Sequence, residues 1–146
     1  MVETKKNLKI LSIAILILAG LSLVFSVTNI FLATSAVQEA TPTASKEVVL
    51  VAQIIVCVIS LLVVLPQVYV GIKGLKMAKN PDSSKAHIVW AIILFVLALL
   101  ALISPITSLV KAEGSLVSNL LNLVDTGLDA IIFALFIKYA KALRVK

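Results

Sequence analysis

The chain has few charged residues. Only 14% of its 146 residues are Asp, Glu, Lys or Arg, whereas 61% are hydrophobic, and the mean hydropathy is +1.16. A soluble domain usually carries about a quarter charged residues, and a small one has a large surface to cover with polar groups. The composition therefore excludes an ordinary soluble domain. The same hydrophobicity excludes a disordered chain.

Cysteine and histidine are almost absent. Cys57 is the single cysteine, which excludes an intrachain disulfide, a CxxC redox pair and a thiolate cluster. His87 is the single histidine, so a metal site with several histidine ligands is also excluded. The sequence contains no HExxH or GxSxG motif and no phosphate-binding loop. We therefore expect no enzyme, no metal site and no cofactor.

Four long stretches are free of Lys and Arg, and only the last of them contains acidic residues. A helix needs about 20 apolar residues to cross the hydrocarbon core of a bilayer. The strands of a membrane β-barrel would be about half as long and would alternate in polarity, which these stretches do not. The sequence predicts an all-α integral membrane protein, a single four-helix domain with transmembrane spans at about 10–35, 48–72, 86–109 and 115–137.

The basic residues are distributed very unevenly around these spans. Only Lys46 and Lys111 lie in the connections after the first and third spans, and the positive-inside rule assigns the richer side to the cytoplasm. We therefore expect four antiparallel helices in a cell (plasma) membrane with both termini cytoplasmic. The net charge of +6 then faces anionic lipid headgroups and requires no nucleic acid. The cytoplasmic set is Lys5, Lys6, Lys9, Lys73, Lys76, Lys79, Lys85, Lys138, Lys141, Arg144 and Lys146.

Several single residues carry local expectations. Ser104-Pro105 and Glu113-Gly114 are expected to bracket the last external turn, and the excess of Lys over Arg is typical of an AT-rich bacterial genome. Cys57 is expected to be a small buried apolar residue. His87 stands beside the lysine-rich connection, where we expect it to be solvated. Aromatic residues near the cytoplasmic ends are expected to anchor the helices at the membrane interface, namely Tyr69, Trp90 and Tyr139.

The last span is amphipathic. At about 100° per residue its polar side chains fall within one arc of about 120°, and leucine and valine occupy the opposite side. Toward the cytoplasm the same arc holds Phe133 and Phe136, so the polar pattern stops near the middle of the membrane. We call these seven polar residues the acidic stripe: Ser115, Ser118, Asn119, Asn122, Asp125, Thr126 and Asp129.

The first two spans carry polar residues at helical spacing and at comparable depth. Because polar groups avoid lipid, we expect them to face one another and the acidic stripe, inside a bundle whose inner half is sealed. Such side chains commonly pack helices together in membranes, and packing is the role expected of them. We call them the supporting polar face: Ser22, Ser26, Asn29, Gln53 and Ser60.

The two aspartates require more than packing. A carboxylate at the centre of a span costs about 2.5–3.5 kcal/mol on insertion scales. The nearest cation on the same helix, Lys138, lies roughly 13 Å from Asp129 along the helix axis. Each acid is therefore protonated, hydrated in a vestibule, bound to a cation, or paired with a basic residue of another protein.

These observations favour two functions. The first is an interaction or accessory module, such as a subunit or an immunity-type protein, which binds a membrane-protein partner or a second copy of itself. The alternative is a proton- or cation-coupled small transporter or channel component that uses Asp125 and Asp129. The first predicts co-purification with a membrane protein, and the second predicts behaviour that depends on pH or cations. The residues expected to bind are Asn119, Asn122, Asp125, Thr126 and Asp129.

Overall fold

The computed structural model describes residues 1–40 and 45–145, and for residue 29 and residues 32–40 it describes the backbone only. This part of the chain consists of helices and short connections. Their bounds are α1 Val2–Ala40, α2 Lys46–Lys79, α3 Ala86–Ala101, α4 Ile103–Val110 and α5 Leu116–Leu143.

Four helical segments are long and apolar enough to cross a membrane. They are Val2–Thr28 within α1, all of α2, the combined stretch Ala86–Val110 and all of α5. Large aliphatic side chains remain exposed around them, as Leu62 and Leu65 of α2 show with exposures of 67% and 61%. The predicted all-helical fold, with four segments long and apolar enough to cross a membrane, is confirmed for the described residues.

The connections follow from local chemistry, with one difference from the sequence prediction. The hydroxyl of Ser45 accepts a hydrogen bond from the amide of Val48 at the start of α2. Helix continues through Pro105, which the sequence analysis placed in a turn, so that prediction is wrong. Proline is tolerated in the first turn of a helix, where Pro105 lies in α4. Because proline has no N–H to donate, the helical hydrogen bonding can be interrupted between α3 and α4. The turn before α5 lies further on, and Gly114 adopts a φ of +72° there.

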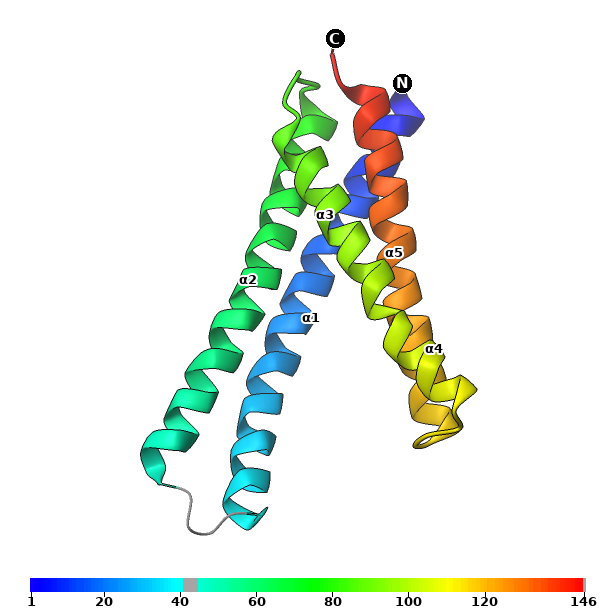
Figure 1. Ribbon diagram of the computed structural model, residues 1–146. Coiled ribbons are helices and arrows are strands. Elements are labelled where there is room, and N and C mark those ends of the chain that lie inside the picture. The colour runs from blue at the N-terminus through cyan, green and yellow to red at the C-terminus, as the bar shows by residue number, and fades with distance from the viewer. Residues whose placement is uncertain (41–44, 146) are drawn as a thin grey trace.

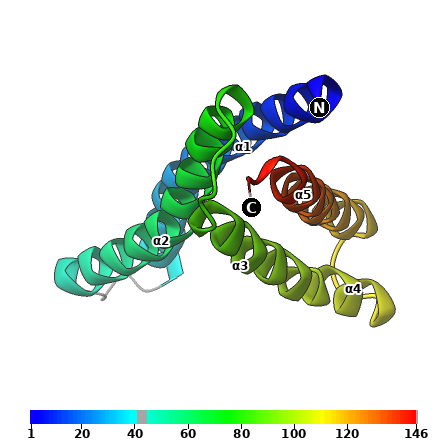
Figure 2. The same cartoon turned by 90° about the horizontal axis from the view of Figure 1, so that it is seen from above.

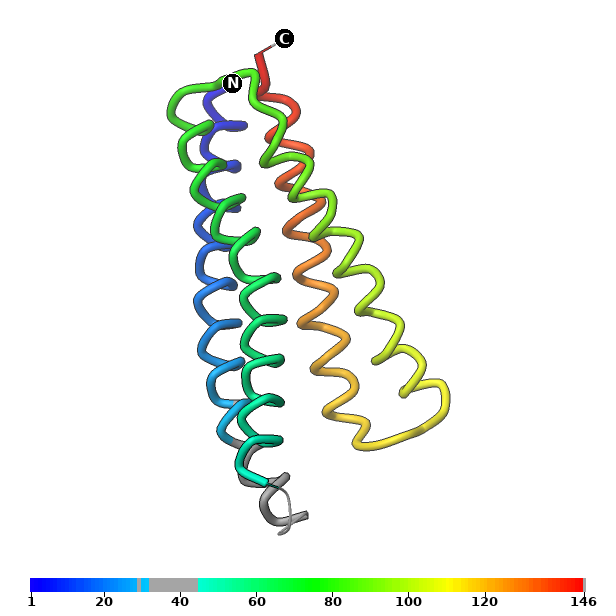
Figure 3. Tube along the Cα trace, turned by 60° about the vertical axis from the view of Figure 1, so that its left-hand side comes forward, coloured from blue at the N-terminus to red at the C-terminus, as the bar shows by residue number. Residues whose placement is uncertain are grey.

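The helices converge at one end of the molecule. Both termini lie at that end, and the α1–α2 pair separates from α3, α4 and α5 toward the other end (Figure 1; Figure 3). Seen from above, α5 lies between α1 and α3 (Figure 2). We call the end with both termini the packed half and the other end the open half.

The hydrophobic core lies in the packed half. It is formed by the first part of α1, the last part of α2, the first part of α3 and the last part of α5. Its largest fully buried apolar side chains are Leu8, Ile15, Val70, Met77 and Phe136.

Two glycines of α2 allow the helices to approach closely in the packed half. A Cβ on Gly74 would collide with the hydroxyl of Ser12 on α1 and with the ring of Phe136 on α5. A Cβ on Gly71 would collide with Leu16 of α1. Small residues at contact positions are how membrane helices gain van der Waals contact when lipid offers no hydrophobic driving force. Gly74 is thus the point where α1, α2 and α5 meet.

Replacing Gly74 tests this packing. Gly74→Ala should lower the free energy of unfolding by about 1–3 kcal/mol, the usual cost of overpacking a core. The measurement is thermal unfolding of the purified protein in lipid nanodiscs. Gly20→Ala is the matched control, because nothing lies within 4 Å of a Cβ there. Equal melting temperatures for the two variants would contradict the close approach at Gly74.

Candidate functional site

The acidic stripe continues the face of α5 that packs against the core. Phe133, Phe136 and Ala140 are buried on this face, and the ring of Phe136 lies against Gly74 of α2. Asp129 precedes Phe136 by seven residues, a spacing that returns a helix to nearly the same direction. The stripe therefore continues the core-facing side of α5 into the open half, where α1 and α2 have separated from α5 (Figure 1).

The exposure of the stripe decreases toward the packed half. Asn122 and Asp125 are exposed, whereas Thr126 and Asp129 are half-buried and Ala130 is buried. Of the two acids, Asp129 is thus the less accessible. Ser115 and Ser118, nearest the open end, are exposed.

Neither carboxylate is partnered within the described part of the chain. Asp125 and Asp129 make no hydrogen bond or ion pair with another described residue, and no described group of three or more His, Cys, Asp or Glu residues forms a metal site. Apart from Lys46 at the start of α2, the basic residues of α1, α2 and α5 lie in the first turns of α1 and the last turns of α2 and α5, in the packed half. The chain thus places two acids on one face of a membrane-length helix and provides no cation for them among these residues.

Asn119 has a structural role at the open end. Its Nδ2 donates a hydrogen bond of 2.7 Å to the carbonyl of Glu113, in the turn that precedes α5. This bond satisfies a carbonyl that follows α4 and fixes the direction in which α5 begins. Asn119 was expected to bind a partner, and the structure gives its amide a partner in its own chain.

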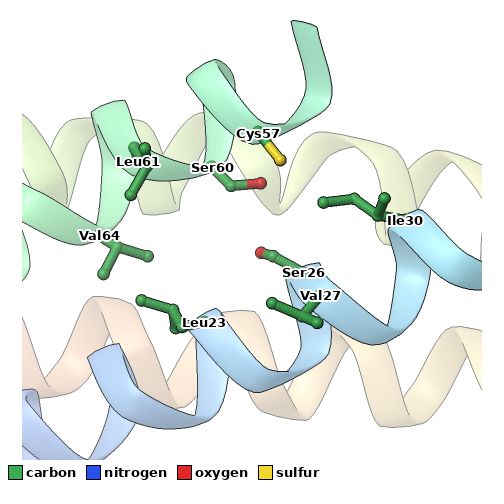
Figure 4. A pocket seen from close by; sticks show the side chains of 8 residues that line it. All are labelled: Leu23, Ser26, Val27, Ile30, Cys57, Ser60, Leu61 and Val64. Atoms are coloured by element: carbon green, nitrogen blue, oxygen red, sulfur yellow. The ribbon is translucent and has the colours of Figure 1, made fainter. Parts of the chain in front are cut away.

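The supporting polar face lies largely between α1 and α2. Ser26, Cys57 and Ser60 line a groove of about 150 Å³ between these helices, together with aliphatic residues (Figure 4). The hydroxyl of Ser26 also donates a hydrogen bond of 2.8 Å to the carbonyl of Ser22, so it is satisfied within α1. Gln53 is half-buried, and the side chain of Asn29 lies outside the described residues.

Two expectations about these residues are wrong. The stripe is not covered by the supporting polar face, since Asn122 and Asp125 are exposed where α1 and α2 have separated from α5. Cys57 is exposed rather than buried, because it lies in the open half beside the groove. Ser26 and Ser60 therefore lie at the contact between α1 and α2 rather than against the stripe.

His87 is buried, contrary to the expectation that it is solvated. It is 1% exposed, its Nε2 lies 3.0 Å from the sulfur of Met77, and its ring meets that of Phe136 edge-on at 6.3 Å. The short connection after α2 brings the first turn of α3 directly onto the end of α2. His87 therefore belongs to the core of the packed half.

The sequence analysis missed two buried polar residues. Ser12 is fully buried, and its hydroxyl donates a hydrogen bond of 2.7 Å to the carbonyl of Leu8. Gln67 is 8% exposed, and its Oε1 has no hydrogen-bond partner. Helical spacing could have identified both, because Gln67 follows Ser60 by seven residues and Ser12 precedes Ser26 by fourteen.

Comparison with protein families, with curated proteins and with solved structures found no match to this chain. The argument about function therefore depends on the site alone.

Proposed function

We propose that this chain is a multi-pass protein of a cell membrane, with four antiparallel spans and both termini in the cytoplasm. The support is the charge distribution, since the basic residues that flank the spans are concentrated at the end of the molecule that carries both termini. In this orientation the packed half is the inner half, and its lysines contact anionic lipid headgroups. The acidic stripe then opens toward the outer half of the bilayer.

We further propose that the protein is an interaction module that binds a membrane-protein partner through the acidic stripe. One observation carries this proposal. The exposed Asp125 and the half-buried Asp129 lie on the core-facing side of α5, with no partner in the described part of the chain. Ionisable residues inside membranes face a partner or a water-filled cavity and are functional by default. A partner helix that supplies donors and a positive charge satisfies both acids.

A cation or proton pathway along the same acids has less support. An ion that entered from the open half would meet Phe136, Gly74 and Ser12 in close contact beyond Asp129. The face of α5 continues there with phenylalanine and alanine rather than polar side chains. Conduction would require the packed half to rearrange, whereas binding requires only that the open half be occupied.

The proposed orientation predicts the labelling of single cysteines in whole cells. In a Cys57→Ser background, Glu113→Cys should react with a membrane-impermeant maleimide added from outside, and Ser83→Cys should react only after the cells are opened. Both positions are exposed, so accessibility within the protein does not limit either reaction. Labelling of Ser83→Cys in intact cells would contradict the orientation.

The interaction module predicts a specific loss of partner recovery. Asp125→Asn/Asp129→Asn removes both charges while it keeps the side-chain shape, and it should lower the recovery of the co-purifying membrane protein by at least about tenfold, the effect of losing roughly 1.4 kcal/mol. Asp129→Asn alone should cause most of this loss. The readout is affinity purification from native membranes with mass spectrometry.

Asp82→Asn is the matched control for this experiment. Asp82 lies between α2 and α3, where its Oδ1 accepts a hydrogen bond from the amide of Ser84. An asparagine retains an acceptor there, so partner recovery should be unchanged. If the double variant recovers its partner in full, the stripe is not the binding face. If no membrane protein is enriched with the wild type and the purified protein instead responds to cations through these acids, the pathway is correct.

A further inference from the structure

Gln67 and Asp129 occupy equivalent positions on two helices that face each other. Gln67 precedes Gly74 on α2 by seven residues, and Asp129 precedes Phe136 on α5 by seven residues. Gly74 and Phe136 are in contact, and both helices end in the packed half. Seven residues advance a helix by about 10 Å and turn it by only about 20° from its starting direction. Gln67 and Asp129 therefore lie at about the same height, each on the face of its helix that leads to the contact of Gly74 with Phe136.

This height is the boundary between the packed and open halves. Leu94 and Ala130 are still buried there, whereas Asp125, one turn further along α5, is exposed. Gln67 is the more buried of the two polar residues, at 8% exposure, and its Oε1 lacks a hydrogen bond. A buried amide oxygen without a partner costs about 1–3 kcal/mol, so a group that donates to it would be stabilised at this point.

We propose that Gln67 Oε1 and the carboxylates of Asp129 and Asp125 form a seat for the ammonium group of a lysine on a membrane-spanning partner helix. This inference rests on the proposed function and specifies the chemistry of the partner. A lysine ammonium has three N–H donors and no acceptor. The seat offers three acceptors from two helices, two of them negatively charged. The three N–H donors thus match the three acceptor groups in number, and the ammonium balances one of the two negative charges.

A second copy of this chain does not fit the seat. The four predicted spans, 10–35, 48–72, 86–109 and 115–137, contain no Lys or Arg, so a copy would bring two further acids to the acids already present. Like charges at short range in a medium of low dielectric constant repel strongly. Arginine fits less well than lysine, because its planar guanidinium is best matched by acceptors lying in one plane. The occupant is therefore a partner helix with a lysine near the bilayer midplane.

A designed helix tests the seat directly. The probe is a synthetic polyleucine transmembrane peptide with one lysine at its centre, and the control peptide carries leucine at that position. Binding to the full chain in lipid nanodiscs is measured by energy transfer between fluorophores. The wild type should bind the lysine peptide at least about tenfold more tightly than the leucine peptide. Gln67→Leu should weaken binding of the lysine peptide about tenfold and leave the leucine peptide unaffected.

Gln53→Leu is the matched control, since it makes the same substitution on α2 two turns before Ser60 in the open half. It should leave both affinities unchanged. Gln67→Met, which is closer to glutamine in shape, repeats the test if Gln67→Leu lowers the melting temperature. Normal lysine-peptide binding by both Gln67 variants, together with loss in Asp129→Asn, would overturn the role of Gln67 and leave the proposed function standing.

Failure of the wild type to distinguish the two peptides would overturn the lysine seat itself. Partner recovery from native membranes would then decide the proposed function separately. If an arginine peptide binds about tenfold more tightly than the lysine peptide, the stripe binds a basic helix but the assignment to lysine is wrong. These results separate the inference about Gln67 from the interaction module on which it rests.

Discussion

The contact of Ser12, Gly74 and Phe136 brings three helices to one point in the packed half. It requires a residue without a side chain on α2, because a Cβ at position 74 would overlap both neighbours. From this point Leu8, Ile15 and Met77 can be fully buried around the contact. Lipid is as apolar as these side chains, so the helices associate through close packing rather than through exclusion of water. The position of this contact near one end leaves the other end without a comparable core.

This uneven distribution of packing gives the acidic stripe its exposure. In the packed half, the core-facing side of α5 carries Phe136. In the open half, where α1 and α2 have separated from α5, the same side carries Asp129 and Asp125. The two parts of one helix face thus have different surroundings. Phe133 and Phe136 are buried in the core, whereas Asp125 and Asp129 have no partner among the described residues. A packed core at one end, and at the other two acids that lack a partner among the described residues, support the proposed binding module.

The four membrane-length helices could be predicted from the sequence because apolar length alone identifies such segments. The direction of the acidic stripe was also predictable, since helical periodicity fixes it relative to Phe133 and Phe136. The neighbours of the stripe could not be predicted. The sequence indicates how deep each residue lies in the membrane, but not which helices approach each other at that depth and which diverge. The burial of His87 depends on how the connection after α2 folds back. The importance of Gly71 and Gly74 depends on which helix faces them, which composition does not reveal.

The central claim is that Asp125 and Asp129 serve a partner and not the chain's own fold. The stability of the isolated protein against unfolding tests this claim most directly. The measurement is the thermal unfolding of purified Asp125→Asn/Asp129→Asn in lipid nanodiscs, compared with that of the wild type. Because neither carboxylate has a partner among the described residues, removal of both charges should leave the melting temperature unchanged or raise it. A clear fall, of several degrees, would contradict the account and would assign the two acids to the packing of this chain.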